Sequence, residues 1–483
     1  MANDSFTRRH FLQQAGGAAA LGAMGSLLPW NKVRAQARPI PGEADWPRFG
    51  YDLHNTRFNA KEKTIGPKNV DRLKVKWKFD VIDGWPIQNV PTVIGDSLFF
   101  GAGAFYYGLE SATGKLKWQF EAGLAGEWAQ SERQLAIRSS CNYANGRIYF
   151  GDGKAVVHCL DAATGREIWN TPMETDYRMS PSMLFSPAVY DGKVMVGYIS
   201  RDPKVACLDA ETGAIRWSWR VAQDTPPERR TGSGPMWTSA AIDEKERIVY
   251  NVTGDPKSYM PGPNLYTDSM VAHDLDTGEL LWAYQPYPQD TGDNDFDTHP
   301  VIYDATAPPR NHGDVRLCVT AGAKGGIFCV NRYTGQRYWK VMLGQPSGGS
   351  GPQIDAIAVA YNKVFVQNIS PTSVPPLAVT AALNAYNGDI EWITPNPFPG
   401  EAPLAVANGV LYQGYIVGHK VEALDAMTGR RIWEYTLPSD FRGGVSIANG
   451  ALYTSNGDSA VERRLDDKRK YDYSVYCFTI DGK

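Results

Sequence analysis

The decapeptide TGDNDFDTHP, residues 291–300, groups several carboxylates in a 483-residue sequence that is otherwise close to charge-balanced. Asp293, Asp295 and Asp297 occupy alternate positions there, and alternate side chains of an extended backbone point the same way. Three carboxylates on one face add up their negative charges. This pattern is compatible with open solvent, with an adjacent cation, or with a site where one carboxylate acts as a base.

A calcium-binding helix–loop–helix motif does not explain this run. Such a loop has glycine at its sixth position and a bidentate glutamate at its twelfth. Counted from Asp293, these positions hold Thr298 and Asp304. Pro300 and the strand-like VIY segment after it also oppose a flanking helix. We therefore reject this motif.

The first 37 residues resemble a twin-arginine export signal. Arg8 and Arg9 precede a weakly apolar run that is rich in Gly and Ala and extends to about Leu28, and residues 33–37 suit signal cleavage. We expect residues 1–37 to be removed and residues 38–483 to form one domain in a bacterial periplasm. A membrane anchor is the weaker interpretation because Pro29 and the glycines interrupt the run, so we expect no membrane span in the mature chain.

Composition argues against a nucleic-acid or membrane-surface partner. Charged residues make up 21% of the chain and the net charge is −3, which gives no basic surface for phosphates. The chain also has 48 Gly and 32 Pro, 12% aromatic residues and no long helical periodicity. This combination favours many short strands joined by turns.

One short motif, exemplified by LDAATGREIW at residues 160–169, recurs seven times along the chain. Each copy reads as a strand, a turn that contains Gly, and an outer strand that ends in Trp. Since an alternating or apolar strand pair precedes most copies, we expect four strands per repeat, which is a propeller blade. The seven copies end at Trp118, Trp169, Trp217, Trp282, Trp339, Trp392 and Trp433.

An incomplete eighth copy, residues 476–482, reaches the turn close to the last residue. Its outer strand is available in residues 73–81, which contain Trp77. Pairing of these two segments would close the ring and leave no open sheet edge. We therefore predict an all-β fold with one eight-bladed β-propeller, closed by its N-terminal strand; seven blades is the competing count.

The cysteines that precede the turn motif occupy a position that Ala423 fills in another repeat, which favours a small buried side chain. These are Cys159, Cys207, Cys329 and Cys477. A disulfide between Cys318 and Cys329 is a minor alternative. No CxxCH motif occurs, so we expect no c-type haem on this chain.

The Trp-marked repeats and the stretch DWPRFGYDLHNTRFN, residues 45–59, together resemble the pyrroloquinoline quinone (PQQ)-dependent alcohol dehydrogenases. Within them the polyvinyl alcohol dehydrogenase-like branch is the closer likeness, over nearly the whole mature chain. Propellers of this superfamily without enzymatic activity share the repeat, so the repeat itself does not indicate a function. The residues that depart from the repeat are more informative.

Three such residues match the family's cofactor and metal positions. Trp237 lies where the resembling enzymes place an indole beneath the flat quinone. Gly254-Asp255 stands where the family generally has Gly-Asn with a metal-binding Asn, and Asp is also a hard oxygen ligand. Lys324 matches an Arg or Lys that relatives hold against the quinone oxygens.

The segment DNDFDTHPV resembles the family's Trp-Asp-Tyr-Asp stretch. This likeness implies that Asp295 is the catalytic base and a metal ligand, and that Asp297 is a second acid of the kind associated with lanthanide-using relatives. In this chemistry the base removes the hydroxyl proton of the alcohol while the quinone accepts hydride beside a metal. We therefore expect PQQ with Ca²⁺ or a lanthanide ion, Asp293 in solvent, and His299 more often solvated than a proton relay.

Other positions depart from the family pattern. Residues 197–206, where a third-blade Glu should bind the metal, contain Asp202 as their only acid, with Ser200 nearby. Gln88 stands where a Glu should contact the cofactor, and we assign it to cofactor binding. The family's vicinal cysteine pair is also absent.

Two functions are compatible with these residues. The first is a periplasmic quinoprotein that oxidises an alcohol and passes electrons to a separate cytochrome c or a similar acceptor. The second is a propeller without cofactor that serves as a binding or assembly scaffold, which the missing Glu and Gln88 favour. The retained carboxylates favour the enzyme.

Overall fold

The computed structural model describes a single compact unit within residues 38–483. The described ranges are 38–81, 85–123, 137–184, 186–223, 234–256, 264–288, 290, 295–308, 314–323, 325–343, 353–369, 378–398, 400, 402–415, 418–457 and 473–483. The twin-arginine segment lies outside these ranges, so its export role stays a prediction. No helix in the described ranges is long and apolar enough to cross a membrane.

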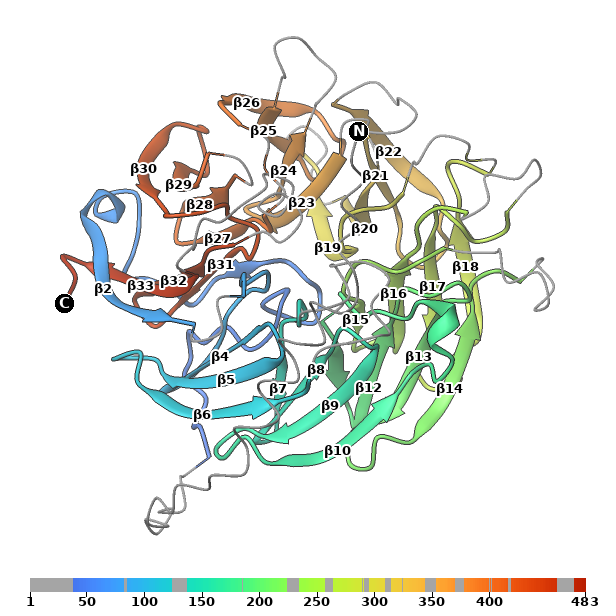
Figure 1. Ribbon diagram of the computed structural model, residues 1–483. Helices are drawn as coiled ribbons and strands as arrows, with labels where there is room; N and C mark the ends of the chain where they lie inside the picture. The colour runs from blue at the N-terminus through green and yellow to red at the C-terminus, as the bar shows by residue number, and fades with distance from the viewer. Residues whose placement is uncertain are drawn as a thin grey trace, which may run out of the picture. The chain divides into compact units, whose positions relative to one another are not determined.

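Eight sheets surround a common axis (Figure 1), each with four antiparallel strands, and in one of them the short strand β1 adds a fifth, parallel strand. Blades 1 to 4 follow one another along the chain, with the first strand of each innermost. Their strands are β3 (Thr92–Ile94), β4 (Ser97–Ala102), β5 (Phe105–Glu110) and β6 (Leu116–Glu121); β7 (Asn142–Ala144), β8 (Arg147–Gly151), β9 (Val156–Asp161) and β10 (Glu167–Pro172); β11 (Ala188–Tyr190), β12 (Lys193–Gly197), β13 (Lys204–Asp209) and β14 (Ile215–Arg220); and β15 (Ala241–Asp243), β16 (Ile248–Val252), β17 (Met270–Asp274) and β18 (Leu280–Tyr284).

Blades 5 to 8 continue the ring in the same way. Their strands are β19 (Val301–Thr306), β20 (Val315–Ala323), β21 (Gly326–Asn331) and β22 (Arg337–Met342); β23 (Gln353–Ala360), β24 (Lys363–Ile369), β25 (Ala378–Asn384) and β26 (Ile390–Asn396); β27 (Ala405–Ala407), β28 (Val410–Gly414), β29 (Lys420–Asp425) and β30 (Arg431–Thr436); and β31 (Val445–Ala448), β32 (Ala451–Ser455), β33 (Ser474–Ile480) and β2 (Leu73–Asp80). Two short 3-10 turns, η1 (Val70–Arg72) and η4 (Tyr177–Met179), complete the described elements with β1 (Phe58–Asn59).

Blade 8 combines strands from both ends of the chain. The outer strand β2 pairs antiparallel with β33, and Trp77 lies opposite Cys477. Innermost strands of neighbouring blades contact one another all the way round, including β3 with β31. The predicted ring closure and the count of eight blades are therefore confirmed.

The repeated Trp and Gly meet between neighbouring blades. Trp118 of blade 1 donates its Nε1–H to the Ala162 carbonyl of blade 2 at 3.1 Å, and Gly165 in that turn packs on the same indole. A Cβ at Gly165, whose φ is +70°, would lie 2.5 Å from the ring. Glycine is needed there both for this conformation and for this approach. The same Trp-to-carbonyl bond recurs at Trp77, Trp169, Trp217, Trp282, Trp339 and Trp392.

Residues 44–59, which we call the central segment, bond to the innermost part of all eight blades. Seven blades are reached by backbone bonds and blade 3 by the Arg48 side chain. The pairs are Trp46 with Val93, Pro47 with Tyr143, Arg48 with Val189, Leu53 with Ile242, His54 with Ile302, Thr56 with Val359, Arg57 with Val406 and Ala44 with Asn449. The stretch quoted above for its family likeness is thus the one that joins the blades at the axis.

Arg57 lies at the centre of this segment and is fully buried. Its guanidinium donates to the carbonyls of Leu404, Phe49 and Val445, and it lies over the rings of Trp46 and Phe49 at 5.6 and 4.8 Å. Burial lowers the pKa of Arg57 to about 9. Carbonyl dipoles and aromatic faces therefore solvate this charge in place of water.

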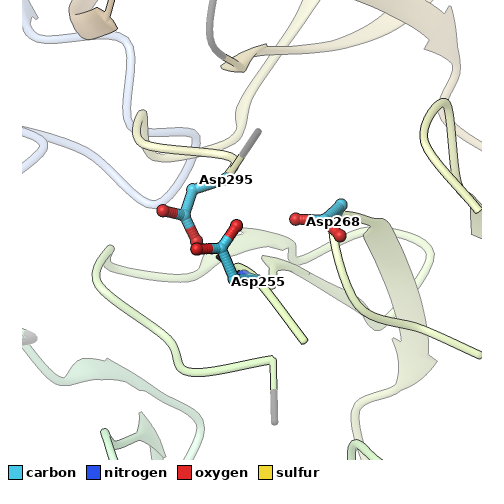
Figure 2. Close-up of side chains that lie close together, drawn as sticks. All are labelled: Asp255, Asp268 and Asp295. Atoms are coloured by element: carbon cyan, nitrogen blue, oxygen red, sulfur yellow. Dashed lines mark hydrogen bonds between the residues drawn. The ribbon is translucent and has the colours of Figure 1, made fainter. Parts of the chain in front are cut away.

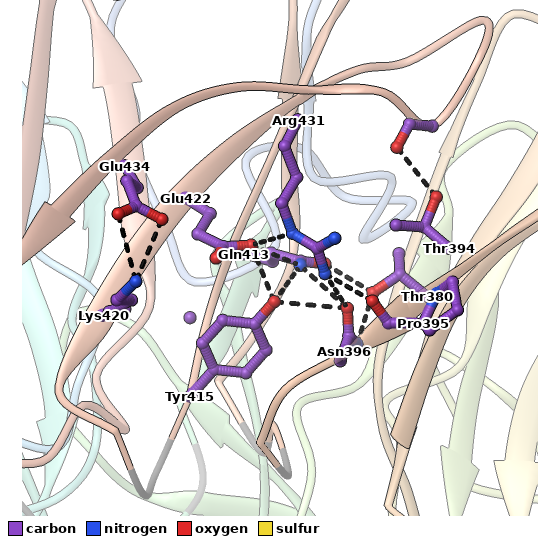
Figure 3. A network of polar contacts seen from close by, with 12 residues as sticks. Thr380, Thr394, Pro395, Asn396, Gln413, Tyr415, Lys420, Glu422, Arg431 and Glu434 are labelled. Atoms are coloured by element: carbon purple, nitrogen blue, oxygen red, sulfur yellow. Dashed lines mark hydrogen bonds and ion pairs between the residues drawn. The ribbon is translucent and has the colours of Figure 1, made fainter. Parts of the chain in front are cut away.

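A buried polar network joins blades 6 and 7 (Figure 3). Glu422 accepts hydrogen bonds from Tyr415 at 2.7 Å, from Gln413 at 3.2 Å and from Arg431 at 3.1 Å. Asn396 of blade 6 accepts from Tyr415 and Arg431, both at 3.2 Å. Because each polar group has a partner, burial of this cluster fixes one orientation of the two blades at little cost.

Two sequence expectations are corrected by the packing. His299 is 2% exposed and lies edge-on to Phe49, with ring centroids 5.2 Å apart, so it is not solvated. Burial, with a smaller effect from the Arg57 charge, lowers the pKa of His299 to about 3. All six cysteines are buried free thiols, so Cys318 and Cys329 do not form a disulfide.

Asn55→Ala tests the role of the central segment. Asn55 Nδ2 donates to the Ser239 carbonyl at 3.0 Å and to the Pro300 carbonyl at 3.2 Å, which belong to the segments that enter blades 4 and 5. Loss of both buried bonds should lower the free energy of unfolding by about 2 kcal/mol, measured by urea denaturation. Asn387→Ala, in an outer turn of blade 6, is the control and should change it by no more than about 0.5 kcal/mol.

His299→Phe tests the pH dependence of stability. The pKa of His299 in the folded chain lies below its ordinary value of 6.5. At pH values between the two, the unfolded chain binds a proton at His299 and the folded chain does not. The contribution of His299 is complete above pH 6.5 and is lost as the pH falls towards 3, by up to about 1.4 kcal/mol per pH unit. Urea midpoints between pH 7 and 4.5 should fall less steeply in the variant; parallel curves would contradict this.

Candidate functional site

The segment that enters each blade has the same register at one end of the axis. In four blades a side chain of this segment packs on a glycine at or next to the end of the second strand of the preceding blade. These contacts join Ile137 to Gly101, Met183 to Gly151, Met236 to Gly197 and Phe441 to Gly414. The residue after each of them therefore takes an equivalent place in the ring. Trp237 is that residue in blade 4, and it is half-buried.

The β16–β17 hairpin of blade 4 holds two aspartates across from each other. Beyond the strands, the Thr253 N–H donates to the Ser269 carbonyl at 2.9 Å and the Asp268 N–H donates to the Gly254 carbonyl at 3.0 Å. Asp268 has a φ of +48°, a conformation that Asp adopts more readily than most residues. Asp255 follows Gly254 directly, so the ladder sets Asp255 and Asp268 at the same end of the hairpin.

Blade 5 contributes Asp295 from its entry segment. Phe296 forms a bridge with Ala323, and the Asp297 N–H donates to the Gly322 carbonyl at 3.1 Å, which anchors the backbone next to Asp295. Asp295 Oδ1 accepts the Asp255 N–H at 2.6 Å and the Trp237 Nε1–H at 3.4 Å. One carboxylate oxygen of Asp295 thus links blade 5 to Asp255 and Trp237 of blade 4.

Asp255, Asp268 and Asp295 form a compact carboxylate group (Figure 2). Each offers an oxygen, and these oxygens lie within 4.8 Å of one another. Asp268 is fully buried, Asp295 is 6% exposed and Asp255 is half-buried. Two like charges at this distance repel by about 3 kcal/mol at an effective dielectric constant near 20. A cation is one way to offset that repulsion.

The donor set of this group fits a hard metal ion. Ca²⁺ prefers carboxylate and carbonyl oxygens at roughly 2.3–2.6 Å, so two oxygens on one ion are at most about 5 Å apart. The three aspartates meet this condition. Gly254 keeps the space open, because a Cβ there would lie 2.2 Å from Asp295 Oδ1 and 2.7 Å from Trp237 Nε1.

The structure brings together three of the residues predicted from the sequence, Trp237, Asp255 and Asp295. Asp297 is half-buried and does not belong to the carboxylate group, and Gln88 is buried in the segment that enters blade 1. Their roles as metal ligand and cofactor contact stay predictions. Lys324 and Asp293 lie outside the described residues.

Asp268 is the member that sequence reasoning missed. No spacing pattern marks it, because its closeness to Asp255 depends on how β16 pairs with β17. The signal that could have found it is the hairpin register, which sets Tyr250 opposite Ala272 and continues to the pair Gly254 and Asp268. Asp202, the acid noted in the third blade, pairs with Arg220 instead.

Residues 46–345 match the family described as "Glucose/ethanol/alcohol dehydrogenase, beta-propeller domain" of the PQQ type. Residues 377–470 match the family described as "Outer membrane protein assembly factor BamB".

Individual proteins give the same family likeness. A quinohemoprotein alcohol dehydrogenase of Comamonas testosteroni is 27% identical, over 97% of this chain and 80% of its own length. A polyvinylalcohol dehydrogenase of a Pseudomonas species is 25% identical, over 91% of this chain and 77% of its own. The solved structure of a europium-containing methanol dehydrogenase shares the fold, with a TM-score of 0.76 at 18% identity over 91% of this chain and 98% of its own.

These matches confirm the resemblance inferred from the repeats and the axial residues. The profile match alone spans well over half of the sequence. The chain belongs to the PQQ β-propeller family of glucose, ethanol and other alcohol dehydrogenases, and it is an oxidoreductase.

Proposed function

We propose that this protein oxidises an alcohol to the corresponding carbonyl compound in the periplasm, with PQQ as hydride acceptor and Ca²⁺ or a lanthanide ion beside it. The observation that carries the proposal is the contact of Asp295 with both Trp237 and Asp255. It joins a candidate base, an aromatic platform and a carboxylate group in one place at the axis.

When bound, PQQ would supply a carbon that accepts hydride, and the metal would supply Lewis-acid polarisation of a quinone carbonyl. The residues present fit both groups. Trp237 offers a half-exposed indole on which a flat ring can stack. The carboxylates of the site offer hard oxygen donors.

Asp295 takes the hydroxyl proton of the alcohol in this proposal. The two donors on its Oδ1, the Asp255 N–H and the Trp237 indole, orient the carboxylate and stabilise its ionised form. We assign the proton to Oδ2, the oxygen that these two donors do not contact. Loss of the proton raises the electron density on the alcohol oxygen, which favours departure of hydride from the adjacent carbon.

The remaining assignments are those inferred from the family resemblance. Gln88 contacts the cofactor with its amide, Lys324 stabilises the negative charge of the reduced quinone, and Asp297 adds a carboxylate beside the metal. Electrons leave to a separate cytochrome c or a similar acceptor. The Comamonas testosteroni relative named above is a quinohemoprotein, a name that pairs a quinone with a haem, and this supports an electron-transfer step.

A scaffold without cofactor is the second candidate, and the match of residues 377–470 to an outer-membrane assembly factor favours it. The described part of this range lies in blades 6 to 8, whereas Asp255 and Asp295 belong to blades 4 and 5. The two candidates differ in a simple observable, because a scaffold takes up neither PQQ nor metal.

The direct test is to purify the mature chain, add PQQ with Ca²⁺ or La³⁺, and follow dye reduction over a panel of alcohols. We expect turnover with at least one metal, and Asp295→Asn should lower kcat by at least roughly 1000-fold because no base remains. Quenching of Trp fluorescence by PQQ should persist in the variant. If neither metal supports PQQ binding or dye reduction in the unaltered chain, the enzyme proposal fails and the scaffold stands.

Gly254→Ala tests the geometry of the site. The added Cβ would overlap Asp295 Oδ1 and the Trp237 indole nitrogen, so both side chains must move. We expect kcat/KM to fall by roughly 100-fold or more, since small misplacements of reacting groups are costly. Circular dichroism should show an intact propeller.

A further inference from the structure

We infer that Asp268 is the third carboxylate ligand of the metal, so that blades 4 and 5 alone supply the anionic shell. This inference deepens the proposed function and rests on its metal site. It replaces the expectation of a third-blade ligand with a second aspartate from the same hairpin that carries Asp255.

The hairpin geometry gives Asp268 its place. Its backbone N–H bonds to the Gly254 carbonyl at 3.0 Å, and Asp255 follows Gly254 in the chain. Through this bond the ladder of β16 and β17 determines how far apart the two carboxylates stand. Asp268 is fully buried, so its position is not that of a surface acid in water.

Among the described residues of the third blade, no acid belongs to the carboxylate group. Asp202 accepts a hydrogen bond from Arg220 Nε, and its own N–H donates to Ser200 Oγ at 3.1 Å. An ion pair within blade 3 thus holds the acid that the sequence suggested. Asp268 is the acid that meets Asp255 and Asp295.

The total negative charge of the three aspartates affects which metal ion the site prefers. Asp255, Asp268 and Asp295 together carry three negative charges when ionised, and their oxygens lie within 4.8 Å of one another, close enough to bind one ion. A trivalent ion neutralises this set, whereas a divalent ion leaves one negative charge in a buried place. We therefore expect the charge of Asp268 to make this site prefer a lanthanide ion over Ca²⁺, whether or not Asp297 also binds the metal.

Terbium binding tests this without any turnover. Trp237 Nε1 lies 3.4 Å from Asp295 Oδ1. The indole is therefore close enough to sensitise the luminescence of Tb³⁺ bound by this carboxylate. Titration of the mature full chain, free of PQQ, should show saturable Tb³⁺ luminescence. Asp268→Asn should weaken Tb³⁺ binding by roughly tenfold or more and Ca²⁺ competition by less, because Asn keeps an oxygen and accepts the same backbone conformation but removes the charge.

Asp202→Asn is the matched control and should leave Tb³⁺ affinity unchanged. Asp297→Asn tests whether Asp297, and not Asp268, supplies the third negative charge at the metal site. Unaltered Tb³⁺ affinity in Asp268→Asn, or a loss confined to Asp297→Asn, would overturn the inference. Thermal unfolding without metal, followed by circular dichroism, shows whether each variant is folded. For an unfolded Asp268→Asn, Asp268→Glu is the second variant, and it should shift the ratio of Tb³⁺ to Ca²⁺ affinity.

The outcome is separable from that of the proposed function. Tb³⁺ binding that depends on Asp268 in a chain that never binds PQQ would support the metal inference and contradict the dehydrogenase. PQQ-dependent dye reduction, together with a Tb³⁺ affinity that Asp268→Asn leaves unchanged, would support the dehydrogenase and contradict the metal inference.

Discussion

The hydrogen bonding of the central segment to the innermost part of all eight blades is the constraint on which the rest of the structure depends. Blades of a propeller otherwise touch only their neighbours, through contacts such as the Trp–Gly pairs between turn and outer strand. One continuous chain that bonds to each of them sets the distances across the axis. Asn55 illustrates this, since a single amide bonds to the carbonyls of two adjacent blades.

The site inherits its rigidity from this arrangement. Ser239 and Pro300, the partners of Asn55, stand two and five residues beyond Trp237 and Asp295 respectively. The segments that carry the indole and the base are therefore held by the same side chain. A metal or cofactor bound between blades 4 and 5 meets groups already placed, and preorganisation of this kind lowers the cost of binding.

The fold could be predicted from the sequence because its signals are local and repeated. Each turn motif brings its own Gly and Trp, and the pairing of Trp77 with the last copy followed from counting. Burial of His299 could not be predicted, because it results from contact with Phe49, a residue far away in the chain. Asp268 was missed for a similar reason: hairpin register, not residue spacing, sets it beside Asp255.

The central segment also has a consequence for how the chain acquires its structure. Residues 44–59 leave the ribosome several hundred residues before their partners Val406 and Asn449. The outer strand β2 likewise cannot pair until β33 has been synthesised. Individual blades can form as they emerge, but the ring closes only after the last blade exists, so the final step is non-local and slow. A chain of this design must finish folding after translation, in the compartment where it is made, if it crosses a membrane already folded.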